Sequence, residues 1–427
     1  MGNLVTSFLK YPLVLITSVI VTRFLGADSK GIYVFMAMIG AVILPIMLLG
    51  IGNGIQYYIS KGVYQVKEAA ISTYLAGLVT SIAVGAFIFF LWQNSLFGET
   101  GNSATIDILL CFLISLPFDS ITYTSRFLLT GDSQFLLLNK LSIVNVVLST
   151  IILGILVFSL SDKLFAAAIG LNSVKIIIAL TTLGIVIKKY QPVFGVNTKY
   201  LREIYDYGLK SWLGNIAGRA NDSLDQLIIG AFVSPGNLGI YSVAYSVVNL
   251  LLIPSNAVSP VLFNEIGRAN DLKKSAQLSA KVHKALFILV ALMGIFLCAC
   301  GYWLIMLMYG KEFIDAYIPM LILIPGMLFY AVSRRVLQKF LAANGYPLKT
   351  STVQIVGAIS GVGMYILLIP KYTIIGAAIG STIAYLVSML TAYFIAKKLV
   401  EGEWNFFAFS KSDIVWAYDR VKSTIRK

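Results

Sequence analysis

Long apolar runs fill this chain almost from end to end, and short clusters of glycine, charged and turn-forming residues separate them. A helix that crosses a bilayer needs about 20 mostly apolar residues, and the runs supply that length. The pattern predicts an all-α integral membrane protein with about twelve transmembrane helices. We expect these spans at residues 4–25, 32–59, 69–92, 106–129, 135–158, 164–187, 204–232, 240–264, 284–308, 317–341, 348–369 and 375–397.

The composition supports a location in a membrane. Of the 427 residues, 58% are hydrophobic and 12% are charged, whereas soluble globular chains are about 25% charged. The mean hydropathy is +0.85. The first apolar run lacks a basic stretch before it and a small-residue cleavage site after it, so we expect an uncleaved first span rather than a signal peptide.

Cysteine and histidine give no sign of a metal site or a disulfide framework. Cys111, Cys298 and Cys300 lie within apolar runs, and the single histidine, His283, has no cluster of cysteine or carboxylate residues around it. We therefore expect no metal and no cofactor, and we expect His283 to be interfacial rather than catalytic.

Basic residues are distributed unevenly among the loops between the predicted spans. The loops after the odd-numbered spans hold only Lys30, Lys163, Lys311 and Lys371, while the other loops and the C-terminal tail hold many more lysines and arginines. Loops rich in these residues face the cytoplasm, so both termini are predicted to be cytoplasmic. Much of the net charge of +14 reflects this topology, and the sequence does not require a nucleic-acid partner.

An internal repeat predicts two similar halves. The motif GIY occurs at 31–33 and 239–241, and the motif AAIG occurs at 167–170 and 377–380, at nearly the same spacing. Because six helices are an even number, both halves would have the same orientation in the membrane.

The repeat and the charge pattern together predict four parts. These are an N-terminal lobe of six spans at 1–187, a cytoplasmic linker at 188–203, a C-terminal lobe of six spans at 204–399, and a basic cytoplasmic tail at 400–427. Apolar residues recur in the tail at helical spacing, which predicts an amphipathic helix on the anionic cytoplasmic leaflet. A loosely ordered basic tail is an equally good interpretation.

Charged residues inside the predicted spans are the candidates for function, because a charge at the centre of a membrane helix costs about 2.5–3.5 kcal/mol on insertion scales. Arg23, Arg126, Lys140 and Lys339 lie near helix ends, where their side chains can reach the headgroups. The remaining candidates are the basic residues Lys10, Lys175, Lys210, Arg219, Arg334 and Arg335 and the acidic residues Asp119, Asp222 and Asp225.

The stretch 204–232 has the most distinctive charge pattern of the apolar runs. Arg219 and Asp222 lie near its centre on one helix face, with Asp225 beside them. In one interpretation Arg219 and Asp222 neutralise each other. In the other, the excess of bases over acids in the spans lines a cationic cavity, which implies an anionic substrate, and arginine suits phosphate through its forked donors. Asp222 and Asp225 are then either counter-charges for Arg219 or part of a site for a coupling cation.

The sequence lacks the motifs of several enzyme classes. It contains no Walker A sequence, no HExxH and no GxSxG. The predicted outward loops are short, and the longest, about 93–105, is too small for a catalytic domain. We therefore expect a transporter rather than an enzyme.

Several stretches resemble, in family order, the Wzx-type flippases of polysaccharide biosynthesis. They cover nearly the whole chain and are RFLGADSKGIYVF (23–35), LGIGNGIQYYIS (49–60), DQLIIG (225–230), LGIYSVAY (238–245), SPVLFNEIGRAN (259–270), YGKEFIDAYIPMLILIPGMLFYAVSRRVLQKFLAANGYP (309–347) and IIGAAIGSTIAYLVS (374–388).

The resemblance implies the MATE-like fold of the multidrug/oligosaccharidyl-lipid/polysaccharide exporter superfamily, with two six-helix lobes around a central cavity. It also implies a function: moving an undecaprenyl-pyrophosphate-linked oligosaccharide to the outer leaflet of the bacterial inner membrane for O-antigen, capsule or exopolysaccharide assembly. The transport would proceed by alternating access, and a Na⁺ or H⁺ gradient would supply the free energy. The implied partners are the lipid-linked oligosaccharide, membrane lipids, a polysaccharide polymerase and chain-length proteins.

Within this resemblance, basic residues of the cavity would bind the pyrophosphate, and by position these are Lys175, Arg219, Arg334 and Arg335. Asp225 matches the acidic residue before the family's Ile-Ile-Gly and is the candidate for a coupling cation. The chain has no clear thirteenth or fourteenth span, unlike the flippases of peptidoglycan precursors.

Two alternatives remain open at this point. A multidrug or cation exporter of the MATE type would favour acidic residues in its cavity, whereas bases dominate here. A membrane polysaccharide polymerase or ligase would need a long outward loop with catalytic residues, which the sequence lacks.

Overall fold

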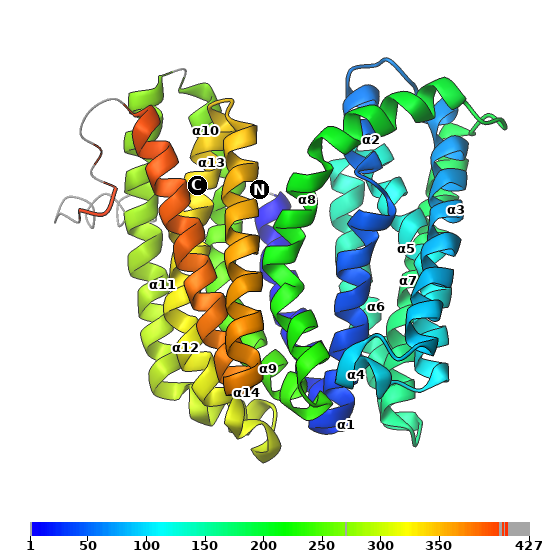
Figure 1. Ribbon diagram of the computed structural model, residues 1–427. Helices are drawn as coiled ribbons and strands as arrows, with labels where there is room; N and C mark the ends of the chain where they lie inside the picture. The colour runs from blue at the N-terminus through cyan, green and yellow to red at the C-terminus, as the bar shows by residue number, and fades with distance from the viewer. Residues whose placement is uncertain (1, 270, 401–403, 405, 409–427) are drawn as a thin grey trace. The chain divides into compact units, whose positions relative to one another are not determined.

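Helices make up almost all of the chain in the computed structural model (Figure 1). The structure describes residues 2–269, 271–400, 404 and 406–408, and of residues 2–9, 11, 211 and 213–224 it describes only the backbone. No strand occurs among the residues so described. Their packing divides the chain into two compact units, Met1–Ser242 and Val243–Lys427.

The first unit is a bundle of long helices. Helix α5 packs against α3 and α7, α6 packs against α1 and α7, and α8 packs along α1, α2 and α4. The helices are α1 (Gly2–Met47), α2 (Ile51–Ser60), α3 (Val66–Gln93), α4 (Gly98–Asn102), α5 (Ile106–Gly131), α6 (Phe135–Ser159), α7 (Lys163–Tyr190), α8 (Thr198–Phe232) and the first half of α9 (Pro235–Val248).

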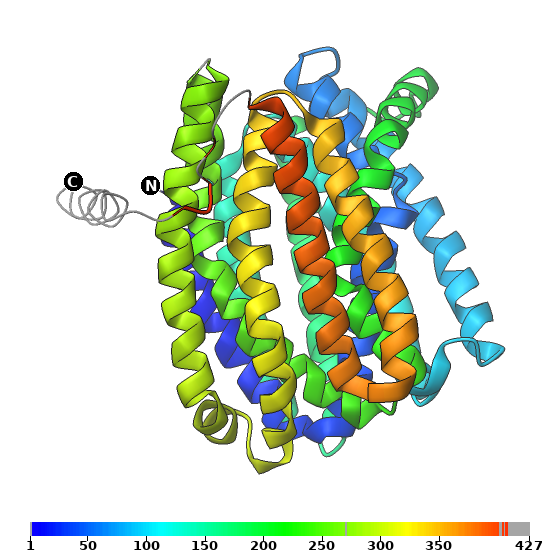
Figure 2. The same cartoon turned by 60° about the vertical axis from the view of Figure 1, so that its left-hand side comes forward.

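The second unit contains α10 (Ile253–Arg268), α11 (Leu272–Met308), α12 (Tyr317–Leu328), α13 (Arg335–Ala343) and α14 (Pro347–Leu399). Short 3₁₀-helices, η1 (Asn249–Leu252) and η2 (Lys311–Ala316), and a π-helix, η3 (Phe329–Arg334), connect them. Helix α12 packs against α11 and α14, and α13 packs against α10 and α14. Figure 2 shows the two halves of α14, orange and red, side by side with opposite directions.

The predicted spans coincide largely with helix, although continuity differs at several places. Helix α1 continues through the first predicted turn with a break at Gly26 (φ 70°), and α14 continues through the last with a break at Thr373 (φ 50°). Conversely, the predicted span 32–59 is interrupted where Leu49 and Gly50 adopt positive φ, so that α2 is a separate helix.

Nine helical stretches in the described part of the chain are long and apolar enough to cross a membrane. Two of them, Pro12–Met47 and Pro347–Leu399, contain the breaks at Gly26 and Thr373. Helix α8, the most charged of the long helices, is not one of the nine. The prediction of an all-α, multi-span membrane protein is confirmed.

The packing boundary and the repeat boundary do not coincide. The repeat places α8 at the start of a C-terminal lobe, whereas its contacts place it in the unit that ends at Ser242. Sequence similarity and packing are different criteria, so the lobes 1–187 and 204–399 stay a prediction. The predicted linker 188–203 consists of the end of α7, a short loop and the first turn of α8, which the Asn197 side chain caps by accepting from the Tyr200 N–H.

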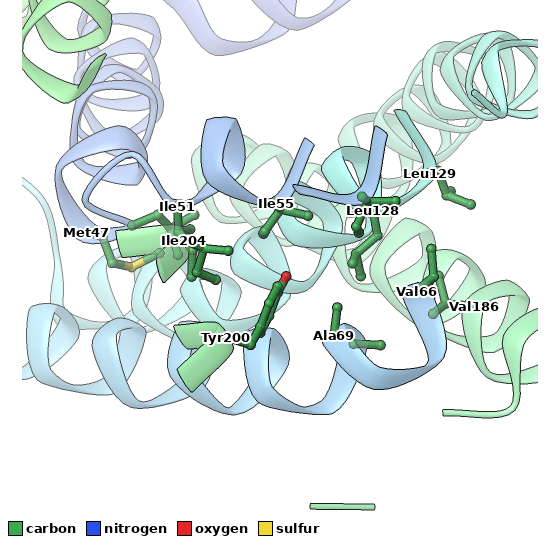
Figure 3. Close-up of a cluster of buried hydrophobic side chains, with 13 residues drawn as sticks. Met47, Ile51, Ile55, Val66, Ala69, Leu128, Leu129, Val186, Tyr200 and Ile204 are labelled. Atoms are coloured by element: carbon green, nitrogen blue, oxygen red, sulfur yellow. The ribbon is translucent and has the colours of Figure 1, made fainter. Parts of the chain in front are cut away.

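A buried apolar cluster holds α2 in place (Figure 3). Ile51, Ile55 and Ile59 recur every four residues, so they share one face of α2. Leu128 of α5 and Ile204 of α8 belong to the same cluster, and four of the five side chains are completely buried.

Glycines allow the backbones of α2 and α8 to approach closely. A methyl group at Gly54 would lie 2.3 Å from the Ile204 carbonyl oxygen, and one at Gly208 would lie 2.6 Å from the Gly50 carbonyl oxygen. Gly50 also has φ of 74°, where a side chain is strained. Gly50 and Gly54 are four residues apart, the spacing at which small residues bring membrane helices together.

His283 is buried by other residues of the second unit, and its position at the membrane interface stays a prediction. Its Nδ1 lies 3.1 Å from the Phe406 carbonyl oxygen and its Nε2 lies 3.0 Å from Ser333 Oγ, while its ring stacks on that of Phe406 with centroids 4.1 Å apart. The Trp404 indole N–H donates to the Ala276 carbonyl oxygen at 2.9 Å. An aromatic segment after α14 therefore covers α11; the amphipathic helix predicted for the rest of the tail lies outside the described residues.

Gly54→Ala is expected to destabilise the protein by about 1–3 kcal/mol, because a backbone oxygen occupies the space of the new methyl group. Gly184→Ala is the matched control, since no atom lies within 4 Å of its added Cβ. We expect the control to be neutral or stabilising by up to about 1 kcal/mol. Thermal unfolding in detergent micelles, followed by tryptophan fluorescence, measures both; equal melting temperatures for the two variants would exclude the close helix contact.

Candidate functional site

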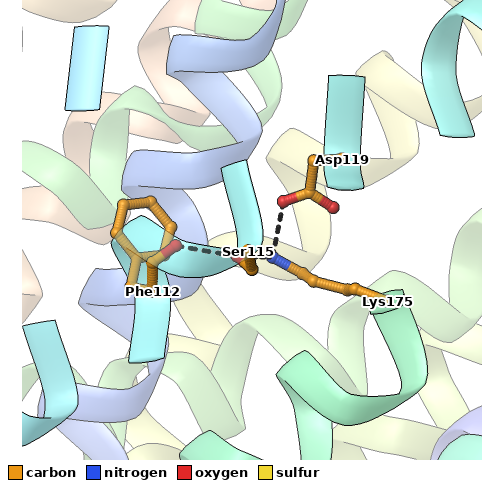
Figure 4. A network of polar contacts seen from close by, with 4 residues as sticks. All are labelled: Phe112, Ser115, Asp119 and Lys175. Atoms are coloured by element: carbon orange, nitrogen blue, oxygen red, sulfur yellow. Dashed lines mark hydrogen bonds and ion pairs between the residues drawn. The ribbon is translucent and has the colours of Figure 1, made fainter. Parts of the chain in front are cut away.

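Lys175 and Asp119 form an ion pair in the first unit (Figure 4). The Lys175 Nζ on α7 lies 2.8 Å from Asp119 Oδ2 and 3.3 Å from Ser115 Oγ, both on α5. Ser115 and Asp119 are one helical turn apart, so they present their oxygens on the same face. The side chains of the pair are only 23% and 20% exposed. A partly buried base is thus compensated by an acid.

A small open hollow lies beside this pair, between α1, α5 and α7. Its polar lining comes mainly from Lys175 and Asn172, one turn apart on α7. Asn172 Oδ1 is buried and accepts no hydrogen bond from the described residues. The other lining residues are mainly apolar: Tyr33, Met36, Ala37, Ile108, Phe112, Leu164, Ala168 and Leu171.

Arg334 and Arg335 lie together in the second unit and share one aromatic ring. The guanidinium carbons lie 4.6 Å and 5.4 Å from the centre of the Tyr330 ring, and Tyr330 itself packs on Tyr385 with centroids 4.5 Å apart. Such cation–π contacts contribute about 0.5–2 kcal/mol each, depending on desolvation. The ring therefore holds two like charges close to each other.

The two arginines differ in their hydrogen bonds. Arg335 donates to the Asn256 side-chain oxygen. Arg334 is only 3% exposed, and its Nε has no hydrogen-bond partner in the described part of the chain. Neither guanidinium forms an ion pair with a carboxylate of the described residues. This arrangement leaves positive charge available to an anion.

The backbone at the arginine pair is irregular. Residues Phe329–Arg334 form the π-helix η3, between α12 and α13. Single π-helical turns within α-helices occur often at functional sites, because they rotate the side chains that follow. Here the turn ends at Arg334, so it sets the direction of both guanidinium groups.

Lys10 and Lys210 have local partners. Lys10 Nζ donates to Ser142 Oγ at 3.2 Å. Lys210 Nζ lies 2.9 Å from Asp206 Oδ2, one turn earlier on α8, and both side chains are exposed. An exposed pair of this kind neutralises charge but contributes little to the stability of the fold.

Asp225 is buried and accepts hydrogen bonds from nearby groups. Its carboxylate accepts from the Tyr241 hydroxyl at 2.9 Å and from the Gln226 backbone N–H at 2.8 Å. Arg219 and Asp222 lie on the helical backbone of α8, but their side chains are outside the described residues. Whether Asp222 and Asp225 are counter-charges for Arg219 or part of a cation site therefore stays a prediction.

Metal-binding groupings do not occur in the described part of the chain: it contains no set of three or more histidine, cysteine, aspartate or glutamate side chains that could hold a metal ion. A coupling cation, if bound by fewer side chains and backbone oxygens, stays an expectation.

The sequence did not predict several of the residues that contact the candidate site residues. The sequence identified Lys175 and Asp119 separately and did not predict that they form a pair. Each lies at the middle of its predicted span, so their equal depth in the membrane could have predicted the pairing. Ser115 follows from helical spacing once Asp119 is known. Tyr330 and Asn256 carry no comparable signal, because their contacts depend on the π-helix and on packing between α10 and α13.

Comparison with known proteins gives consistent matches. The family model described as "Polysaccharide biosynthesis protein" matches residues 20–318, more than half of the chain. The chain is 23% identical over 414 residues to the "Capsular polysaccharide biosynthesis protein CapF" of Staphylococcus aureus, covering 93% of this chain and 97% of that protein. It is 20% identical over 384 residues to the "Probable low-salt glycan biosynthesis flippase Agl15" of Haloferax volcanii, covering 88% and 78%.

Solved structures of transporters have the same fold. The lipid II flippase MurJ in an inward closed conformation aligns with a TM-score of 0.77 at 14% identity, covering 97% of this chain and 89% of that one. An inward-facing multidrug resistance MATE family transporter aligns with a TM-score of 0.69 at 15% identity, covering 94% and 96%. These likenesses confirm the MATE-like fold. The extent of the family match shows that this multi-pass membrane protein belongs to the polysaccharide biosynthesis protein family.

Proposed function

We propose that this protein is a flippase that moves an oligosaccharide linked to undecaprenyl pyrophosphate from the cytoplasmic to the outer leaflet of a bacterial inner membrane. The observation that carries the proposal is the arginine pair Arg334 and Arg335, which has no carboxylate partner among the described residues. The names of the relatives CapF and Agl15 support the substrate class.

The chemistry of the pair favours a phosphate-bearing ligand. A guanidinium keeps its charge and offers paired N–H donors that match two oxygens of a phosphate. Arg334 is nearly buried, and a buried charge without an opposite charge is costly. A pyrophosphate anion that reached both groups would remove that cost, so the pair favours anionic over neutral or cationic cargo. This argues against export of cations by a MATE-type mechanism.

Transport without covalent chemistry is the simplest role for this chain. The relatives are named for flippases and polysaccharide biosynthesis rather than for a hydrolase or transferase. We propose that the charged cargo crosses by alternating access and that a Na⁺ or H⁺ gradient drives the transport, with Asp225 as the candidate ion-binding residue. A polysaccharide polymerase and chain-length proteins would act on the product.

The first prediction for this function concerns the arginine pair. Arg334→Gln and Arg335→Gln are each expected to lower the initial rate of flipping in liposomes by about 10- to 100-fold, because a hydrogen bond to a charged group contributes about 1.5–3 kcal/mol. Lys371→Gln, an exposed lysine in the break region of α14, is the control and should keep the wild-type rate. Wild-type rates in both arginine variants would refute an anion site at this pair.

The second prediction separates a binding role of Lys175 from a structural one. Lys175→Ala and Arg219→Ala are each expected to abolish surface polysaccharide in cells without lowering the amount of protein in the membrane. Lys175→Ala also leaves Asp119 without its counter-charge, so the double variant Lys175→Ala/Asp119→Ala is compared with it. Immunoblots of membranes and of polysaccharide measure both quantities.

If Lys175 binds substrate, the double variant stays inactive. Recovery of polysaccharide in the double variant would mean that the pair only neutralises charge. Normal polysaccharide in both Lys175→Ala and Arg219→Ala would contradict a cationic cavity altogether.

A further inference from the structure

A group of stacked tyrosines lies where α2 and α8 meet in the first unit. The rings of Tyr57 and Tyr207 stack with centroids 4.3 Å apart and planes 15° apart. Tyr58 meets Tyr57 edge-on at 5.2 Å and lies 6.1 Å from Tyr207. We call Tyr57, Tyr58 and Tyr207 the tyrosine platform.

Further aromatic residues pack behind the platform. Tyr58 contacts Tyr64, which in turn contacts the completely buried Tyr200 with centroids 4.8 Å apart. The Tyr64 hydroxyl donates to Glu203 Oε2 at 2.8 Å. Desolvation and this carboxylate raise the pKa of Tyr64, in the turn after α2, to about 12. The rings are thus fixed before any ligand arrives.

The backbone is shaped to bring these rings together. The positive φ of Leu49 and Gly50 ends α1 and starts α2 in a new direction. Gly50, Gly54 and Gly208 then allow the two helices to meet without intervening side chains. Because the helices touch along their glycines, the large residues beside the seam, Tyr57 and Tyr207, meet ring to ring.

The platform remains accessible and is bordered by polar groups. Tyr57 is 38% exposed although Tyr207 covers one face of its ring. Exposed hydrogen-bonding side chains lie next to the platform residues in sequence or one helical turn away: Gln56, Ser60, Asp206 and Lys210. An amide, a hydroxyl, a carboxylate and an ammonium around a flat apolar ring suit a ligand with both apolar faces and many hydroxyl groups.

We propose that the tyrosine platform binds sugar rings of the lipid-linked glycan. The inference rests on the proposed function. A pyranose ring presents a face of C–H groups that packs on an aromatic ring, and its equatorial hydroxyls reach the polar border. The hydrocarbon tail of the lipid would gain nothing from Asp206 and Lys210, which favours the glycan as the occupant.

The test compares two probes on full-length protein in lipid nanodiscs. One probe is the lipid-linked oligosaccharide fraction extracted from cells that encode this chain, and the other is undecaprenyl pyrophosphate without sugar. Tyr57→Ala and Tyr207→Ala are expected to raise the Kd for the first probe by about three- to tenfold, the range of aromatic stacking contributions. The Kd for the second probe should stay within about twofold, since stacking is not involved.

Two control variants guard against loss of folding. Tyr57→Phe keeps the ring and should bind both probes as the wild type does. Tyr372→Ala removes a tyrosine that is 54% exposed outside the platform and should also be neutral. Melting temperatures are recorded for all variants.

Each remaining outcome counts against a defined part of the proposal. Equal loss of affinity for both probes would assign the tyrosines to lipid contact or structure, as in the aromatic belts of membrane proteins. Unchanged affinities in both alanine variants would overturn the platform alone. A wild-type protein that binds neither probe would overturn the proposed function, and the platform would lose its occupant.

Discussion

The hydrocarbon core of a bilayer offers no hydrogen-bond partner to a peptide group, and this constraint shapes the whole chain. Each backbone N–H and C=O must be satisfied within the protein, so long helices are the only economical solution here. Where the backbone departs from α-helix, a local feature of the structure therefore has to account for it. At Gly26 and Thr373 the chain turns between helices, at Leu49 and Gly50 it redirects α2 towards α8, and at Phe329–Arg334 a π-helix replaces α-helical bonding.

The same low-dielectric surroundings explain why charged residues form pairs or share aromatic rings. Lys175 is neutralised by Asp119 from the neighbouring helix. Arg334 and Arg335 instead share the face of Tyr330, which lowers the cost of their charge without cancelling it. The first arrangement is complete by itself, whereas the second leaves positive charge unmatched by the described carboxylates. That difference is why the arginine pair, rather than Lys175, carries the proposed binding of pyrophosphate.

Hydrophobic pattern alone predicted the helices well, because the length and apolarity of each run directly reflect the bilayer. It did not predict that α2 is separate from α1, since a break of two residues at Leu49 and Gly50 leaves the apolar run intact. It also did not predict the contacts of His283, because the aromatic segment that covers this residue is distant in sequence. The sequence identified the charged residues of the candidate site from their position near the middle of the predicted spans. Their partners Tyr330 and Asn256 depend on side-chain geometry that spacing does not encode.

Movement of a lipid-linked glycan between leaflets is the central claim, and it can be measured directly. Purified protein is reconstituted into liposomes that contain the lipid-linked oligosaccharide, and the fraction accessible to an added glycan-modifying enzyme is followed with and without a sodium or proton gradient. A flippase increases the accessible fraction from about one half towards completion, and faster when one of the gradients is imposed if that ion is coupled. An accessible fraction that stays the same as in protein-free liposomes, under both gradients and without them, would contradict the proposed function.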